Sequence, residues 1–357
     1  MTPTERHVSD RVSTPGTSGQ TSRLRSMLGP VSRIPTPAIF GASVAIALVV
    51  LWFQGSLRDL VEIVGSANVP ILLVAAPVYV ASLGLLCYRW HLLVRMSHGA
   101  SDLARASEAF LTSIVINYAA PIGLAVPSRA VLTKRALGLD ARATGTIAVW
   151  EIGMDVIVLG AGTLLWLLLA KGSTSAVGGE LGDSVRTYAV AGLALTAIAA
   201  VGGWWFLRTA DRRARVFESG KRILLAPRDR PLEAALALGA TSLYWLIQGT
   251  VLTLLLSAFG VDWSFVFILG LTTLPILVGM LSPIPGGAVV REALMYTVAR
   301  MAGVPGDPVI AAALVYRIAL FAAIPILYGL VRWWILRRGD STTSKGGRHT
   351  ASRSPST

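Results

Sequence analysis

Several residue types are scarce in this sequence, and each scarcity excludes a kind of site. The chain has 1 cysteine, Cys87, so one chain can form neither a disulfide bond nor a cysteine-based metal site. Its 4 histidines are scattered without the spacing of metal ligands, and we expect no metal and no cofactor. No P-loop, nucleophile elbow or other catalytic signature is present. The sequence therefore favours a transporter-like protein over an enzyme.

Charged residues are also few, at 14% of the chain, whereas 54% of the residues are hydrophobic. The mean hydropathy is +0.64. Apolar runs of about 20 residues recur, which is the length needed to cross a bilayer core of roughly 30 Å. The composition thus predicts an all-α polytopic membrane protein. Most of the net charge of +13 lies between the apolar runs, where it favours anionic lipid headgroups as partners and not nucleic acid.

Apolar and charged segments alternate along the chain. Residues 1–36 and 336–357 are basic and rich in Ser and Thr, which predicts disordered tails, the first of them without the apolar core of a signal peptide. Between them we expect one transmembrane domain, residues 37–335. Its full spans are expected at 37–55, 69–88, 143–170, 185–207, 232–259 and 307–334. Two more apolar pieces, 107–134 and 264–300, contain Pro and Gly and are ambiguous.

The distribution of Lys and Arg decides how the ambiguous pieces cross the membrane. Short loops rich in these residues stay in the cytoplasm, and both the N-terminal tail and the loop 208–231 are strongly basic, so an even number of crossings separates them. Reading 107–134 as a re-entrant hairpin from the cytoplasm meets this condition, and the same reasoning makes 264–300 a hairpin from outside. The hairpin bends are expected at Pro121, Gly123, Pro283, Pro285, Gly286 and Gly287.

The resulting layout is six full spans and two hairpins, about eight apolar segments in all. Residues 37–170 and 185–335 each read span, span, hairpin, span, with the second set inverted relative to the first. Pro121 precedes Arg129 by the same interval that separates Pro283 from Arg291. The sequence therefore predicts an inverted repeat, and transporters of this kind bind substrate between the repeats at broken helices.

Charged residues inside the apolar segments are the candidate site. A charge facing lipid at the bilayer centre costs about 2.5–3.5 kcal/mol, so these side chains should point into the protein. Arg129, Arg291 and Arg317 are expected to bind a lipid phosphate, while Glu151 or Asp155, four positions apart on one helix face, releases it or takes up a proton. The structural alternative is that one carboxylate pairs with Arg317 and only locks two spans together.

Three further polar residues have two readings each. Asn117, at the first bend, contacts substrate or satisfies freed backbone groups. Glu292 contacts substrate or stabilises the start of a helix through its dipole. Gln248 lies in apolar sequence and either joins two helices by a hydrogen bond, which we expect, or binds a ligand.

The segment PIPGGAVVRE at 283–292, the following helix with Arg317, the earlier PSR at 127–129, and Glu151 and Asp155 together resemble a known family. It is the lysylphosphatidylglycerol synthase transmembrane or flippase-like family, and the likeness covers about residues 39–334. The resemblance implies an inner-membrane protein that moves, or helps to modify, a lipid with a charged headgroup. The first hairpin departs from it, since it reads GLAVPSR where a Gly-Gly and an acidic residue are expected.

We therefore expect the chain to translocate a charged-headgroup lipid or a polyprenyl-phosphate-linked lipid for envelope biogenesis. Its expected partners are these membrane lipids and a separate lipid-modifying enzyme. We expect it in the cell (inner) membrane with both termini in the cytoplasm. Two alternatives remain open, a membrane-embedded transferase acting on a lipid-linked substrate and a non-catalytic subunit of an envelope-synthesis complex.

Overall fold

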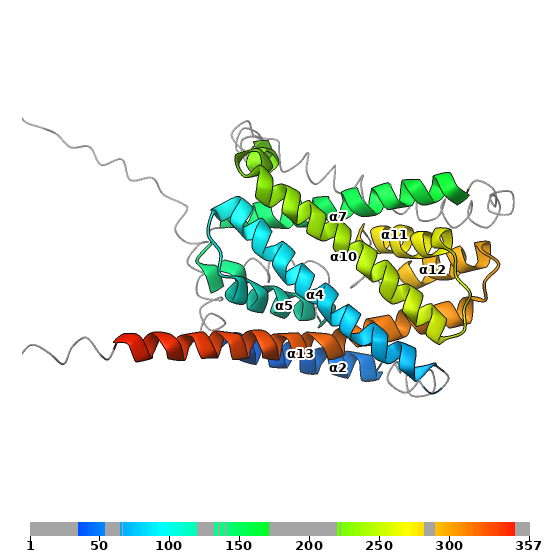
Figure 1. Cartoon of the computed structure of the whole chain (residues 1–357), viewed down its shortest axis with the longest axis horizontal. Helices are drawn as coiled ribbons and strands as arrows, with labels where there is room; N and C mark the ends of the chain where they lie inside the picture. Colours follow the sequence, from blue (N-terminus) through cyan, green and yellow to red (C-terminus); the bar gives the residue numbers. More distant parts are fainter. Residues whose placement is uncertain are drawn as a thin grey trace, which may run out of the picture.

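A computed structural model describes residues 35–53, 65, 67–119, 132–134, 136–139, 141–170, 220–221, 223–281 and 290–346. Its main elements are all helices (Figure 1): α2 (Thr36–Phe53), α4 (Val69–His98), α5 (Leu103–Ala119), α7 (Ala141–Leu169), α10 (Pro231–Ala258), α11 (Phe265–Leu281), α12 (Val290–Met301) and α13 (Gly306–Gly346). Of these, 4 are long and apolar enough to cross a membrane, namely α4, α7, α10 and α13. The expected fold class, an all-α polytopic membrane protein, is confirmed.

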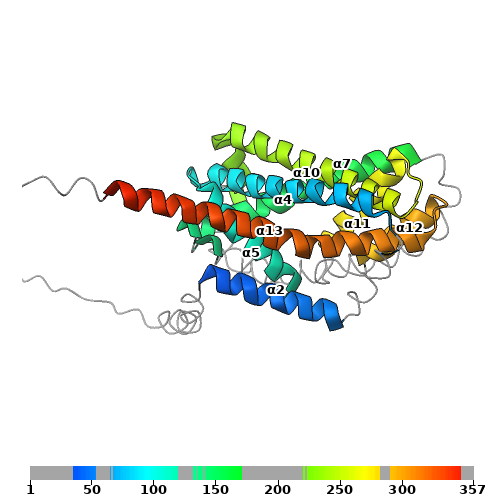
Figure 2. The same cartoon turned by 60° about the horizontal axis from the view of Figure 1, so that its bottom comes forward.

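The antiparallel helices α4 and α10 lie side by side (Figures 1 and 2) and form the most extensive helix–helix contact in the described part of the protein. At one end the backbone N–H of Asn68 donates to the carbonyl of Ala258 at 2.8 Å. At the other end Arg95 Nη2 lies 3.4 Å from Glu233 Oε1. These contacts fix the register of the two helices over their whole length.

The remaining helices pack around this pair. Both α7 and α13 contact α4 and α10, and α5 lies against α4 and α13 with α2 on its outer side. Helices α11 and α12 pack against each other, α11 also contacts α7, and α12 also contacts α13. The C-terminal part of α13 projects beyond the other helices (Figure 2). Every labelled helix therefore contacts at least one other helix of the bundle.

The contact between α7 and α11 is close because it contains glycines. A Cβ on Gly270 of α11 would lie 2.5 Å from the indole Nε1 of Trp166 on α7. A Cβ on Gly162 of α7 would lie 2.6 Å from Cγ2 of Thr273 on α11. Without a hydrophobic effect between helices in lipid, such close van der Waals contact is a main source of their association.

Several helices extend beyond their expected limits. Helix α4 continues to His98, so Arg89 lies within the helix and not at its end. Helix α5 begins at Leu103, and α13 continues through Ile335 to Gly346, into the segment expected to be a disordered tail. The expected span 185–207 and the expected bends of both hairpins lie outside the described residues.

Candidate functional site

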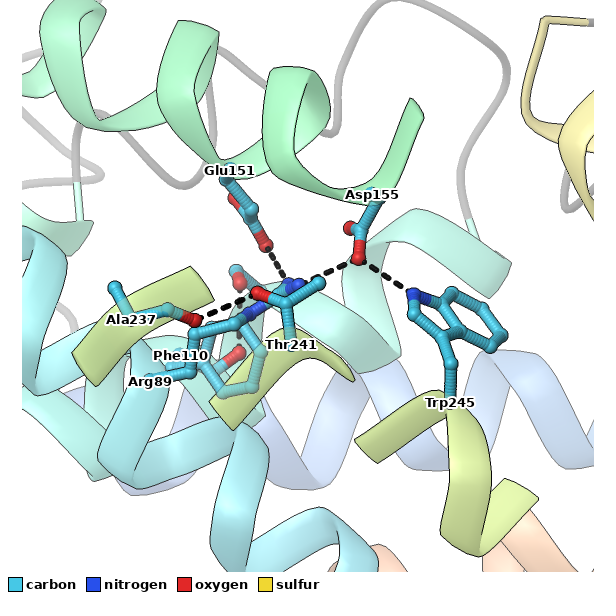
Figure 3. Close-up of polar contacts among 8 residues, drawn as sticks. Arg89, Phe110, Glu151, Asp155, Ala237, Thr241 and Trp245 are labelled. Atoms are coloured by element: carbon cyan, nitrogen blue, oxygen red, sulfur yellow. Dashed lines mark hydrogen bonds and ion pairs between the residues drawn. The ribbon is translucent and has the colours of Figure 1, made fainter. Parts of the chain in front are cut away.

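Arg89 forms the most buried ion pairs in the described part of the chain (Figure 3). Its Nη1 donates to Oδ1 of Asp155 at 2.6 Å, and its Nη2 donates to Oε1 of Glu151 at 3.4 Å. The three side chains are only 4%, 9% and 8% exposed. Glu151 and Asp155 are one turn apart on α7, so both carboxylates face the single guanidinium of α4.

A third helix joins this cluster through Trp245 of α10. Its indole Nε1 donates to the same Oδ1 of Asp155 at 2.9 Å, as Figure 3 shows. Asp155 therefore links α4, α7 and α10 at one point. Removing one member of a buried ion pair leaves an uncompensated charge, so this cluster holds the three helices in a fixed arrangement.

The partner of these carboxylates differs from the structural alternative derived from the sequence. That alternative paired Glu151 or Asp155 with Arg317, whereas both carboxylates form ion pairs with Arg89. The sequence reasoning missed Arg89 because it ended the second span at Tyr88 and treated the next residue as interfacial. The apolar residues Leu92, Leu93 and Val94, which follow Arg89, were the signal that the helix continues.

Arg317 belongs to a second and less buried cluster. Its Nη1 lies 3.4 Å from Oε1 of Glu292, and the two side chains are 24% and 27% exposed. Glu292 stands in the first turn of α12, directly after the undescribed segment 282–289. Arg291 lies with its Cζ 4.8 Å from the ring centroid of Tyr316 on α13. The described residues thus bring Arg291, Glu292 and Arg317 together at the junction of α12 and α13.

The two clusters lie at different depths along α4. Tyr316 packs edge-on against Tyr79 of α4, with ring centroids 5.2 Å apart. Since Arg89 follows Tyr79 by ten positions, the two contacts are separated by roughly 15 Å along the helix axis. Glu151 and Asp155 are therefore placed beside Arg89, and Arg291, Glu292 and Arg317 beside Tyr79.

Two of the expected site residues cannot be placed in either cluster. Arg129 lies outside the described residues, with the expected bends around it. Asn117 lies in the last turn of α5, and its side chain is outside the described part of the structure.

Glu108 forms a third polar contact, which the sequence reasoning did not single out. Its Oε1 accepts a hydrogen bond from the hydroxyl of Tyr328 at 3.2 Å and lies 3.4 Å from Nη1 of Arg332. The ring of Phe40 on α2 stacks on Tyr328 at 3.8 Å. This contact joins α5 to the last span. Among the described residues no group of three or more His, Cys, Asp or Glu side chains is placed to hold a metal ion.

The fold and the charges within its spans define a multi-pass α-helical membrane protein. Residues 40–329 match the family model described as the lysylphosphatidylglycerol synthase TM region, and the chain belongs to this family. The resemblance noted from the sequence is thereby confirmed for the membrane part, and it associates the chain with lipid flippase-like or envelope-lipid functions. A search of curated proteins and a search of solved structures found no match.

Proposed function

We propose that this protein translocates a lipid with a charged headgroup, either an anionic phospholipid or a polyprenyl-phosphate-linked lipid, across the membrane. The observation that carries the proposal is the partly exposed Arg317–Glu292 pair with Arg291 beside it. Arg317 follows the start of α13 by eleven positions, or roughly 17 Å, which is about half of a 30 Å bilayer core. An incompletely buried ion pair at that depth is costly unless it serves a substrate path.

The chemistry of this cluster suits reversible phosphate binding. A guanidinium binds a phosphate through two parallel hydrogen bonds, and Nη1 of Arg317 already contacts Oε1 of Glu292. A lipid phosphate would displace this carboxylate, and the carboxylate would displace the phosphate on release. Because the Glu292 carboxylate and the lipid phosphate compete for Arg317, the site does not hold its substrate too tightly.

The arrangement of the helices supports the inverted repeat on which the proposal depends. If α4 and α10 are equivalent, then α5 corresponds to α11 and α7 to α13. Each contact in one half then has a counterpart in the other. The α4–α5 contact matches α10–α11, and α4–α7 matches α10–α13. Likewise α4–α13 matches α10–α7, and α5–α13 matches α11–α7. The antiparallel α4–α10 pair then forms the interface between the repeats, and α11 with α12 forms the second hairpin.

The buried cluster has a different role in this proposal. Asp155 and Glu151 keep Arg89 in place and fasten α7 to the α4–α10 pair, so they act as a scaffold and do not bind the phosphate. Arg129, near the first bend, is the remaining candidate for a phosphate contact from the other repeat.

The orientation follows from the positive charges at one end of the bundle. Arg95 at the end of α4 and Arg230 at the start of α10 meet there, and α13 ends with Arg332, Arg337 and Arg338. Basic residues beside spans remain in the cytoplasm, so we assign this end to the cytoplasmic side of the cell membrane, with both termini inside.

Lipid exchange in proteoliposomes tests the proposal. The purified protein is reconstituted with phosphatidylglycerol carrying a fluorophore, and dithionite then quenches the outer leaflet. We expect the wild type to exchange lipid well above empty vesicles, and Arg291→Ala and Arg317→Ala to lose most of this activity. Arg95→Ala is the matched control, because it removes a surface positive charge paired with Glu233. Wild-type exchange no faster than that of empty vesicles would overturn the proposed function.

A further inference from the structure

Gln248 of α10 is a buried amide whose hydrogen bonds are not made within the described residues. Its side chain is among the largest that are fully buried, at 1% exposure. Neither Oε1 nor Nε2 has a hydrogen-bond partner in the described part of the chain. The expected role of joining two helices is therefore not seen there. An amide with an unused donor and an unused acceptor destabilises a buried site unless something else binds to it.

Gln248 lies in the seam between α4 and α10. It belongs to the buried face formed with Thr241, Tyr244, Leu252 and Leu255, at the three- and four-residue spacing of one helix side. Helix α4 is the main neighbour of α10. The end contacts of this pair set the register, which places Gln248 level with about Tyr79. Gln248 is thus at the depth of the cluster formed by Arg291, Tyr316 and Arg317.

Arg89 has an unused donor in the same seam. Its two terminal nitrogens bind Asp155 and Glu151, but its buried Nε–H has no partner among the described residues. Trp245, one turn before Gln248, donates to the same Asp155. The seam therefore contains unused donor nitrogens at two depths, Nε of Arg89 and Nε2 of Gln248, and one unused acceptor, Oε1 of Gln248.

The unused groups specify the chemistry of the missing partner. Oε1 of Gln248 accepts hydrogen bonds only, so its partner must be a donor, which excludes an ionised phosphate oxygen. Nε2 of the same side chain donates only, so that partner must also be an acceptor. A hydroxyl group both donates and accepts, so it can bind both Oε1 and Nε2 of Gln248.

We propose that Gln248 forms a subsite for a hydroxyl group of the lipid headgroup. This inference rests on the proposed function and deepens it, because it adds a neutral polar subsite beside the phosphate-binding arginines. The subsite lies in the α4–α10 seam, the interface between the two proposed repeats, where inverted-repeat transporters bind their substrates. An internal water carries the same chemistry, and the experiment distinguishes the two sources.

The test compares two anionic lipids that differ only in headgroup hydroxyls, phosphatidylglycerol and phosphatidylpropanol. Both are titrated onto the detergent-solubilised full-length protein, and the shift in Tm gives the apparent Kd. We expect the wild type to bind phosphatidylglycerol about five- to tenfold more tightly, the effect of one net hydrogen bond. Gln248→Met should lose this preference while keeping its affinity for phosphatidylpropanol.

Stability in the absence of lipid provides a second readout. Since Gln248→Met removes an unsatisfied amide at similar volume, it should leave the lipid-free Tm unchanged or raise it by about 2–4 °C. Thr241→Val is the matched control, because the Thr241 hydroxyl is buried on the same face but bonds to the Ala237 carbonyl at 2.8 Å. The control should retain the wild-type lipid preference.

Two results would overturn the subsite. One is a wild type that binds both lipids equally, and the other is a preference that survives in Gln248→Met, as expected if internal water occupies the amide. Because these are binding measurements, their outcome is separate from the lipid-exchange test. Absent exchange with an intact hydroxyl preference would overturn transport and leave the subsite standing.

Discussion

The Arg89 guanidinium on α4 lies 2.6 Å from the Asp155 carboxylate on α7, where less than a tenth of either side chain is exposed. In the bilayer such a pair has no water to replace a lost partner. The charged residues within the helices are therefore of two kinds, buried and partly exposed. Arg89, Glu151 and Asp155 neutralise each other inside the bundle, whereas Arg317 and Glu292 remain about a quarter exposed and suit exchange with a ligand.

Replacing Arg89 should be among the most destabilising single changes. Arg89→Met leaves the two carboxylates of α7 without their cation, and we expect a loss of about 3–5 kcal/mol in the free energy of unfolding. Adding Glu151→Gln and Asp155→Asn should recover much of this loss. Denaturant unfolding in detergent measures the effect, with Arg95→Met as the surface control at about 0–1 kcal/mol. A stable Arg89→Met protein would show that the cluster is not structural.

Glu292→Gln should strengthen the binding of anionic lipid. In the proposed mechanism the carboxylate competes with a lipid phosphate for Arg317. Its removal is therefore expected to lower the apparent Kd several-fold and to slow lipid exchange through slower release. Titration with phosphatidylpropanol and the dithionite assay measure the two effects on the same preparation. Weaker binding in Glu292→Gln would contradict the assignment of Glu292 as a competing counter-ion.

A methyl group on Gly270 should separate α7 from α11. The added Cβ meets the rigid indole of Trp166 at 2.5–2.7 Å, and overpacking of this kind costs about 1–3 kcal/mol. Gly160→Ala on α7 is the control, because nothing lies within 4 Å of its Cβ position and Ala favours the helix by up to about 1 kcal/mol. Thermal unfolding of both variants shows whether the close α7–α11 contact stabilises the protein. Equal Tm values for the two variants would argue that it does not.

Glu108 and Arg332 should be energetically coupled. A double-mutant cycle with Glu108→Gln and Arg332→Gln is expected to give about 1 kcal/mol, since Glu108 is largely buried while the Arg332 side chain is 39% exposed. Tyr328→Phe should cost a similar amount, because its hydroxyl donates to the same carboxylate. Additive single mutants would show that α5 is not held to α13 at this point.

Cysteine labelling should place the two ends of the bundle on opposite sides of the membrane. In a Cys87→Ala background, Trp263→Cys reports on the connection between α10 and α11, at a position that is 51% exposed. Arg337→Cys reports on the end of α13 that we propose to be cytoplasmic. An impermeant maleimide added to intact cells should label the first and leave the second unlabelled until the cells are opened. The reverse pattern would invert the proposed orientation.

Periodicity and charge bias predicted most of the helices but not all their limits. The spans at 69–88, 143–170, 232–259 and 307–334 correspond to α4, α7, α10 and α13, because about 20 apolar residues in a row have few other stable structures. The end of α4 was misplaced at Tyr88, since a sequence does not show whether an arginine is neutralised by a distant carboxylate. Arg89 and Asp155 are 66 positions apart.

The sequence by itself determined that the chain is a polytopic helical membrane protein, which family it belongs to, and which charged residues lie within its apolar segments. These properties depend on composition and on local order along the chain. Only the tertiary structure decided which charges meet: Arg89 with Glu151 and Asp155, Arg317 with Glu292, and Glu108 with Arg332. Three of these four pairs join helices that are far apart in sequence. Which side chains meet depends on helix register and rotation, which hydropathy does not encode.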